Sequence, residues 1–152
     1  MSGQVVTSKS INTTAQLLKS DKQMLTVLLA HVPFVAFLIP LGHDTMTFSV
    51  IASLITGALA LGNYAMFRGT RAAGCISAVL LMLFSAIMIQ ARGGEIEMHF
   101  HIFGGIALTI LYRDALIVVV AAATIAIHHL VLTAMQLSDA VAGINKCHSP
   151  FP

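Results

Sequence analysis

Charged residues are scarce in this chain: only 9% of its 152 residues are Asp, Glu, Lys or Arg, whereas 57% are hydrophobic. A soluble globular domain carries roughly 25% charged residues, so this composition excludes an ordinary soluble domain. The length allows one domain only. The net charge of +2 and the lack of a basic cluster interleaved with aromatics exclude a nucleic-acid partner. What remains is a protein whose surface meets a lipid bilayer.

Three further features are missing. The two cysteines provide no disulfide framework, because Cys75 falls in an apolar run and Cys147 in the polar tail. No secretory signal peptide is expected, because the N-terminal residues lead into an apolar run with no small-residue cleavage site behind it. No nucleotide, flavin or quinone motif and no Ser-His-Asp or Cys-His arrangement is evident. We therefore expect no catalytic activity.

Long hydrophobic runs, in contrast, fill most of the chain. Each is close to the roughly 17–25 residues that a membrane-spanning helix needs, and the short polar breaks make consecutive helices antiparallel neighbours. The runs are Met24–Leu41, Met46–Phe67, Ala72–Ala91, Glu95–Leu111 and Ala115–Gln136. The sequence therefore predicts an all-α integral membrane protein, a bundle of about five transmembrane helices. Residues 1–23 would form a cytoplasmic N-terminal segment, 24–137 the bundle and 138–152 a polar tail.

Lysine and arginine predict the orientation of the bundle, because they are enriched in cytoplasmic loops. With a cytoplasmic N-terminus, six of them fall inside and only Arg92 and Lys146 outside; the six are Lys9, Lys19, Lys22, Arg68, Arg71 and Arg113. We therefore expect a multi-pass protein with its N-terminus in the cytoplasm. Within the first helix, Pro33 should cause a kink, because it cannot donate a hydrogen bond to the Leu29 carbonyl.

The chain has seven histidines, and most lie in the apolar runs. Ionisable side chains are costly in a bilayer, so they usually face the bundle interior and mark a functional site. Those in the runs are His31, His99, His101, His128 and His129, whereas His43 and His148 should be exposed to solvent. In the predicted orientation, His31, His99, His101 and His129 all lie between the midplane and the outer face. Depth therefore permits a shared site.

Helical spacing sorts these residues. Glu95 with His99, and Glu97 with His101, are four apart and share a face. His99 and His101 are two apart, so they point to nearly opposite sides and would not bind one ion together on a regular helix. The candidate metal ligands are His31, Glu97, His99, His101 and His129. Glu95 and His128 are candidates for residues that do not bind the metal directly but orient a metal-binding imidazole ring and raise its basicity.

The cofactor stays open between two kinds. Imidazole binds copper, zinc, iron and nickel, and the soft thioethers of Met46, Met88 and Met98 add possible copper(I) ligands. Haem b needs only one or two axial histidines and an apolar slot. The number of histidines and the adjacent carboxylates exceed that need, so we favour a transition-metal ion, copper first, with iron or zinc as alternatives.

The same residues fit other functions. Histidine titrates near neutral pH, so the set could sense protons without any cofactor. Histidines and glutamates can also serve a metal or proton transporter, although no internal repeat or pair of broken helices indicates one. A histidine-rich membrane redox enzyme is the remaining alternative.

Residues 93–103, which read GGEIEMHFHIF, resemble a bacterial sequence pattern, G-G-x-I-E-x-H-F-H-x-F. The pattern continues with Tyr112-Arg113-Asp114 and a late histidine, here His129, and His31-Val32-Pro33 matches an H-x-P in the first helix. It is similar to the N-terminal transmembrane sensory module of chemoreceptors (methyl-accepting chemotaxis proteins), sensor histidine kinases and diguanylate cyclases. The resemblance covers most of residues 24–132.

The resemblance implies a sensory-input role in the bacterial inner membrane. It also implies a homodimer and a cytoplasmic output domain, fused or separate, as the partner. It implies a functional role for His31, Glu97, His99, His101 and His129, whereas position 128 is not a fixed histidine in the pattern. The related modules have a further helix before the output domain, so we expect this chain to be truncated before those parts, the alternative being a naturally shortened, stand-alone protein.

Overall fold

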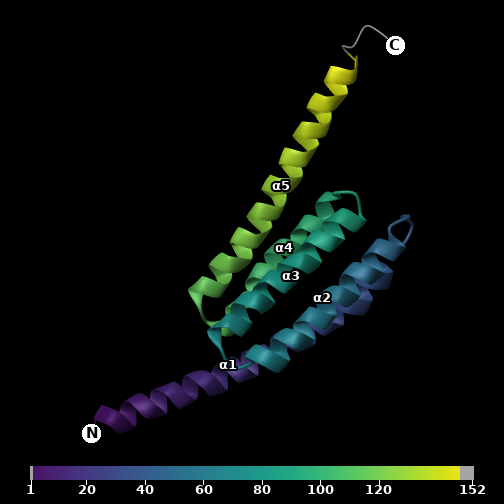
Figure 1. Cartoon of the computed structure of the whole chain (residues 1–152). Coiled ribbons are helices and arrows are strands. Elements are labelled where there is room, and N and C mark those ends of the chain that lie inside the picture. The colour runs from purple at the N-terminus through teal and green to yellow at the C-terminus, as the bar shows by residue number, and fades with distance from the viewer. Residues whose placement is uncertain (1, 148–152) are drawn as a thin grey trace.

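The computed structural model describes the backbone of residues 2–147 and the side chains of residues 13–138, and within that range it contains helices and no strand. The expected exposure of His148 lies outside the described residues. The elements are α1 (Ser2–Pro33), the π-helix η1 (Phe34–Leu38), α2 (Met46–Phe67), α3 (Arg71–Ala91), α4 (Ile96–Leu108), the 3₁₀-helix η2 (Thr109–Tyr112) and α5 (Ala115–Cys147) (Figure 1). The prediction of an all-α bundle is confirmed.

Four of the helices are long and apolar enough to cross a membrane: residues Thr13–Leu38 of the first, then α2, α3 and Ala115–Ser138 of α5. The helix predicted over Glu95–Leu111 is present as an apolar helix at Ile96–Tyr112, which is shorter than the four spanning candidates. Its α-helical part has 13 residues, about 20 Å at the usual rise, and the 3₁₀ turn η2 adds about 8 Å, against roughly 30 Å of hydrocarbon core. It tightens into η2 at Thr109, and Arg113 then takes a left-handed conformation with φ 54°.

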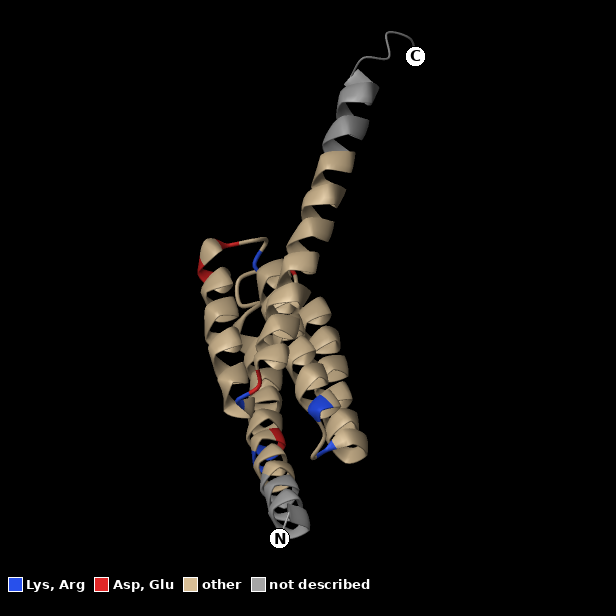
Figure 2. Ribbon diagram, turned by 90° about the vertical axis from the view of Figure 1, so that its left-hand side faces the viewer, with Lys and Arg blue, Asp and Glu red and all other residues tan. Residues whose placement is uncertain are grey.

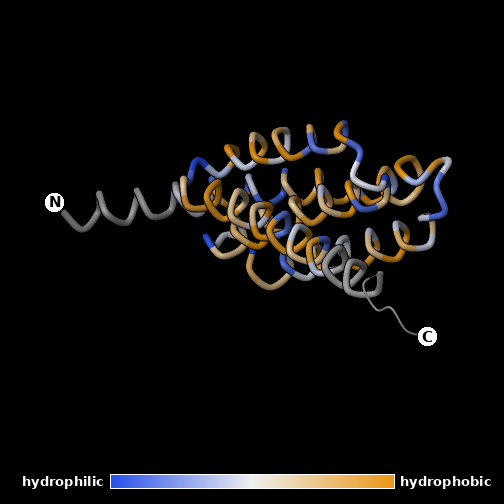
Figure 3. The backbone as a smooth tube through the Cα atoms, turned by 90° about the horizontal axis from the view of Figure 1, so that it is seen from above, coloured by the Kyte–Doolittle hydropathy of each residue, from blue (hydrophilic) through white to orange (hydrophobic). Residues whose placement is uncertain are grey.

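Helix α3 lies at the centre of the bundle and packs against each of the other four α-helices. Its residues Leu81, Met82 and Phe84 are fully buried. Hydrophobic residues run along all the helices, and hydrophilic residues concentrate in the turns (Figure 3). In contrast, α5 extends beyond the other helices (Figure 1), and large apolar side chains such as Leu130 are exposed on it. These surfaces suit contact with lipid.

The regular helix α1 ends at Pro33, and η1 follows it directly. Proline supplies no backbone N–H, so the hydrogen-bond pattern has to change at this position. The chain continues with wider turns, in which the Ile39 N–H donates to the Phe34 carbonyl at 3.3 Å, five residues earlier. The change in helical geometry therefore lies two residues after His31.

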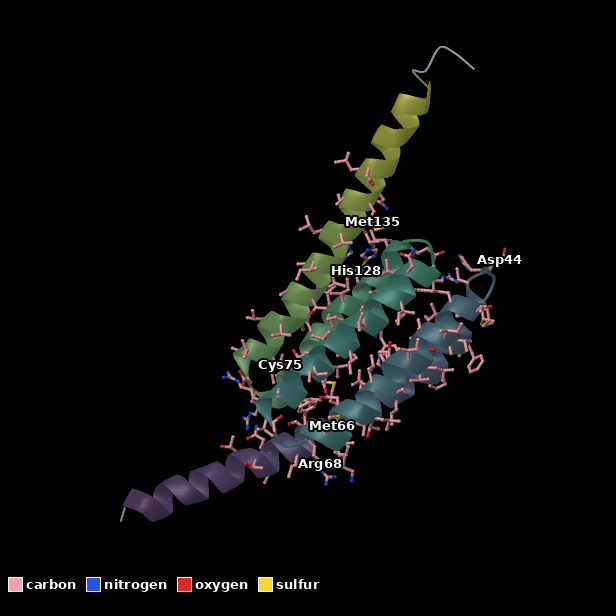
Figure 4. All side chains as sticks on the ribbon, viewed as in Figure 1. Asp44, Met66, Arg68, Cys75, His128 and Met135 are labelled. Atoms are coloured by element: carbon pink, nitrogen blue, oxygen red, sulfur yellow. The ribbon has the colours of Figure 1, made fainter. Side chains whose placement is uncertain are left out.

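The two ends of the bundle differ in charge. The basic end, defined by the turns at residues 68–70 and 113–114, carries most of the described lysines and arginines (Figure 2). The opposite end consists of the loops at residues 39–45 and 92–95. Figure 4 shows Asp44 and Arg68 at these two ends. This distribution matches the count on which the predicted orientation rests.

Hydrogen bonds connect neighbouring helices and loops at each end of the bundle. At the basic end, Arg71 donates two hydrogen bonds to Asp114, which links the start of α3 to the start of α5. The Arg71 guanidinium holds the pKa of the Asp114 carboxyl below its ordinary value. At the opposite end, the Thr45 hydroxyl donates to the Ala91 carbonyl at 2.8 Å, and Arg92 donates to the Leu41 carbonyl at 3.3 Å. The loop after η1 is thereby joined to the loop after α3.

Candidate functional site

His31 of α1 and His101 of α4 meet inside the bundle. Their Nε2 atoms lie 2.8 Å apart, and the ring centroids are 5.0 Å apart with the planes at 72°. Both side chains are half-buried. These residues are 70 positions apart in the chain, so only the packing of the bundle brings them together.

The outer nitrogen of each ring is held by a polar group. The Nδ1 of His31 is 2.7 Å from the Val27 carbonyl oxygen. A carbonyl only accepts hydrogen bonds, so Nδ1 carries a proton and Nε2 of a neutral His31 is an acceptor. The Nδ1 of His101 is 2.7 Å from the hydroxyl oxygen of Ser85 in α3. Both rings are therefore fixed in orientation with their Nε2 atoms facing each other.

The pair has two consistent arrangements of its protons. In the first, the Ser85 hydroxyl donates to Nδ1 of His101, and Nε2–H of His101 donates to Nε2 of His31. In the second, Nδ1 of His101 carries the proton and donates to Ser85, whose hydroxyl turns to the Leu81 carbonyl, 3.4 Å away. The second arrangement leaves a lone pair on each Nε2 atom and no proton between them, so it is favourable only when a cation lies against both nitrogens.

The surroundings of the pair are mostly apolar. The ring of Phe84, which is fully buried, lies 5.5 Å from the ring of His31. Ser85 is fully buried as well. In such surroundings a charge is poorly solvated, so a cation bound between the rings would depend on the imidazole nitrogens for its stabilisation.

A second group of histidines joins α4 to α5. The rings of His99 and His129 stack with centroids 5.3 Å apart and planes at 14°, and His128 lies 5.7 Å from His129. His99 donates through Nδ1 to the Glu95 carbonyl at 3.1 Å. The Nε2 of His128 is buried and has no hydrogen-bond partner among the described residues. His99 and His101 thus face different neighbouring helices, as their spacing predicts.

The side-chain carboxylates of Glu95 and Glu97 contact neither of the two histidine groups. Glu97 is exposed and makes no hydrogen bond or ion pair with the described residues. The carboxylate of Glu95 pairs with Arg92 at 2.8 Å and with the exposed His43 at 3.8 Å, so Glu95 reaches His99 only through its backbone. Among the described residues, no three His, Cys, Asp or Glu side chains gather closely enough to hold a metal ion. The candidate ligands form two histidine groups instead of one cluster.

Sequence reasoning missed Ser85 and Phe84, which contact the first pair from α3. A serine and a phenylalanine inside an apolar run give no signal of their own, because both are common in transmembrane helices. Only the contact with His101 identifies Ser85 as part of the site. The exposure predicted for His43 is confirmed, but its ion pair with Glu95 was not anticipated.

In comparisons with known proteins, no protein-family model, no curated protein and no solved structure matches this chain. The resemblance to bacterial sensory modules therefore stays a prediction.

Proposed function

We propose that the chain is the transmembrane sensory-input module of a bacterial signalling protein, and that His31 and His101 together bind one transition-metal ion. The observation that carries the proposal is the 2.8 Å separation of their Nε2 atoms. Each Nδ1 is held by a separate polar group. Metal-binding histidines almost always have their second nitrogen held in this way.

The separation also bears on which ion would bind. With metal–imidazole bonds of about 2.0 Å, two nitrogens 2.8 Å apart subtend an angle of roughly 90° at the metal. Tetragonal and square-planar coordination, the preference of copper(II) and nickel(II), has this angle. Tetrahedral zinc would need about 3.3 Å between the nitrogens. Two axial ligands of a haem would need about 4 Å across the iron. Copper(II) is therefore the favoured ion, ahead of zinc and of haem b.

Two protein ligands leave coordination positions open. Structural metal sites are usually closed by four protein ligands, whereas open positions accept water or an exchanging ligand. Because the described residues supply no third His, Cys, Asp or Glu ligand, the ion would exchange with its surroundings. Reversible occupancy suits a sensor better than a permanent structural metal.

Ion binding would couple the helices. An ion between His31 and His101 joins α1 to α4, and its binding would turn the Ser85 hydroxyl toward its own helix. A ligand shifts a conformational equilibrium only by its difference in affinity for the two states. The ion would favour the helix arrangement in which the Nε2 atoms of His31 and His101 lie close together. We propose that a cytoplasmic output domain, fused or separate, reads this change in a homodimer placed in the inner membrane, N-terminus inside.

The test is copper(II) binding to the purified protein in detergent, measured by titration against a chelator and by electron paramagnetic resonance. Wild-type protein should bind about one copper per chain with nitrogen hyperfine structure from two imidazoles. H31Q and H101Q should each lose that signal, and the double variant should be no worse than either. H43Q, at an exposed histidine outside the pair, is the control. Unchanged copper stoichiometry and hyperfine structure in both H31Q and H101Q would exclude this site.

The same pair supports a second candidate, proton sensing without a metal. A separation of 2.8 Å is also a normal length for one N–H···N hydrogen bond. An additional proton would convert the pair into an imidazole–imidazolium pair. Between pH 5 and pH 8, chelator-treated wild type should then change the thiol reactivity of the half-buried Cys75 beyond the rise that thiolate formation causes in any protein. H101Q should show only that ordinary rise. A response that needs added copper at every pH would favour the metal.

A further inference from the structure

A small polar cavity lies near the basic end of the bundle, away from the histidines. Its volume is about 10 Å³, and Asp21 of α1, Asn63 of α2 and Ser77 of α3 line it together with apolar side chains. A cavity of this size holds about one water molecule or one ion of similar radius. Asp21 precedes His31 by ten residues on α1, or about 15 Å along the helix axis. The cavity is therefore separate from the proposed metal site.

Asp21 is a buried carboxylate with one oxygen unused. Asp21 is only 3% exposed to solvent. Oδ2 accepts the backbone N–H of Gly69 at 2.7 Å, whereas Oδ1 is buried without a hydrogen-bond donor. The described ion pairs involve other carboxylates, so Asp21 has no cationic side chain to pair with within the described residues. A buried carboxylate in this position needs a cation or a proton to neutralise it.

Asn63, which lines the same cavity, has a second unused side-chain oxygen. Its amide nitrogen donates to the Ala73 carbonyl at 3.1 Å and to the Ser77 hydroxyl oxygen at 3.0 Å. A carbonyl can only accept, so these bonds settle which end of the amide is nitrogen. Oδ1 is buried and lacks a donor, and Asn63 is 7% exposed. The Tyr112 hydroxyl is also buried, and it lies close enough to Asp21 and Ser77 to interact with both, although without the geometry of a regular hydrogen bond.

We infer that this cavity binds one monovalent cation of the size of sodium, held by Oδ1 of Asp21 and Oδ1 of Asn63. Carboxylate and amide oxygens are hard ligands, which alkali and alkaline-earth ions prefer over soft metals. The single carboxylate balances one positive charge, whereas a divalent ion would leave an uncompensated charge in an apolar interior. The cation would join α1, α2 and the turn that contains Gly69. It would thereby stabilise the end of the bundle from which α1 leaves.

The test compares thermal unfolding of the detergent-purified chain in sodium chloride and in choline chloride at equal ionic strength. Circular dichroism at 222 nm follows the unfolding. A ligand that binds only the folded state raises its stability with concentration, so the wild-type Tm should rise by a few degrees and saturate with sodium but not with choline. D21N should lose this dependence. D114N, which removes a carboxylate from the same end but not from the cavity, should keep it.

Direct binding provides a measurement that does not depend on the folding of a variant. The ²³Na resonance should broaden in the presence of wild-type protein and narrow again when lithium is added in excess. Equal wild-type Tm values in sodium and choline, with no broadening, would overturn the inference and leave the cavity to a water molecule or a proton. A rise in the Tm of D21N above that of wild type, without sodium dependence in either, would have the same meaning.

Discussion

Ser85 of α3 and His101 of α4 are joined by a hydrogen bond of 2.7 Å between Oγ and Nδ1. Ser85 is fully buried on the most central helix, and its own oxygen also lies 3.4 Å from the Leu81 carbonyl. The hydroxyl can therefore either donate to the ring or accept from it. This freedom allows His101 to present a lone pair to a ligand without leaving a buried group unpaired.

Ser85→Ala should weaken copper binding by about 10- to 100-fold, the usual effect of removing a group that orients a metal-binding histidine. The variant keeps both imidazoles, so stoichiometry and the number of nitrogen ligands should stay the same. Ser53→Ala is the matched control, because Ser53 is an equally buried serine whose hydroxyl donates only to the Val50 carbonyl of its own helix. Equal copper affinities in S85A and wild type would show that Ser85 does not support the site.

Gly74→Ala should destabilise the bundle by about 1–3 kcal/mol, the usual range for overpacking. A Cβ at Gly74 would lie 2.4 Å from Cδ1 of Ile117, which is fully buried, and 3.1 Å from the Tyr112 ring. Either the Ile117 side chain would have to change its conformation or helices α3 and α5 would have to separate. Gly62→Ala is the control, because a Cβ there meets nothing within 4 Å and alanine favours a helix. Chemical unfolding in detergent measures both, and an unchanged G74A would contradict the close packing.

Asp114 should make stability depend on pH in the acid range. Its pKa is lowered in the folded protein by the hydrogen bonds from Arg71. A carboxyl with a lowered folded pKa contributes stability above its unfolded pKa of about 3.9 and loses that contribution as the pH falls through the folded value. The Tm of wild type should therefore fall more steeply than that of D114N between pH 5 and pH 2. Parallel curves would mean that the Arg71–Asp114 pair adds nothing in solution.

The orientation can be tested with single cysteines in a Cys75→Ala/Cys147→Ala background. Asp44 and Arg68 are both exposed and lie at opposite ends of the bundle (Figure 4). If the N-terminus is cytoplasmic, D44C should react with an impermeant maleimide added outside intact spheroplasts. R68C should react only after the membrane is opened. The reverse pattern would place the histidine pair in the inner half of the membrane.

Much of the helical arrangement was predictable from hydrophobic runs and their polar breaks. The second run, Met46–Phe67, coincides with α2, and the third differs from α3 by one residue. The fourth run, Glu95–Leu111, differs by one residue at each end from the apolar helix at Ile96–Tyr112. What the sequence did not predict is that this helix changes from α to 3₁₀ geometry after Leu108. The start of the first helix was also missed, because helical structure continues into the polar residues before Met24.

The sequence correctly predicted which site residues lie on different faces of one helix. It did not predict which residues of the neighbouring helices they contact. The two-residue spacing of His99 and His101 correctly placed them on different sides of α4, because helical rotation per residue is nearly constant. Their partners, His129 for one and His31 for the other, depend on how α4 packs between its neighbours. The roles of Ser85 and of the buried Asp21–Asn63 pair had no pattern in the sequence at all.

The residue types alone determined the class of this protein. Sparse charge, long apolar runs and basic residues biased to one side specify apolar helices suited to a bilayer, because those properties depend on local composition and on the cost of exposing polar groups to lipid. Only the tertiary structure decided that the histidines form two groups and that Asp21 and Asn63 share a cavity. Such contacts join residues far apart in the chain, and lateral helix packing, which no local periodicity encodes, sets their distances.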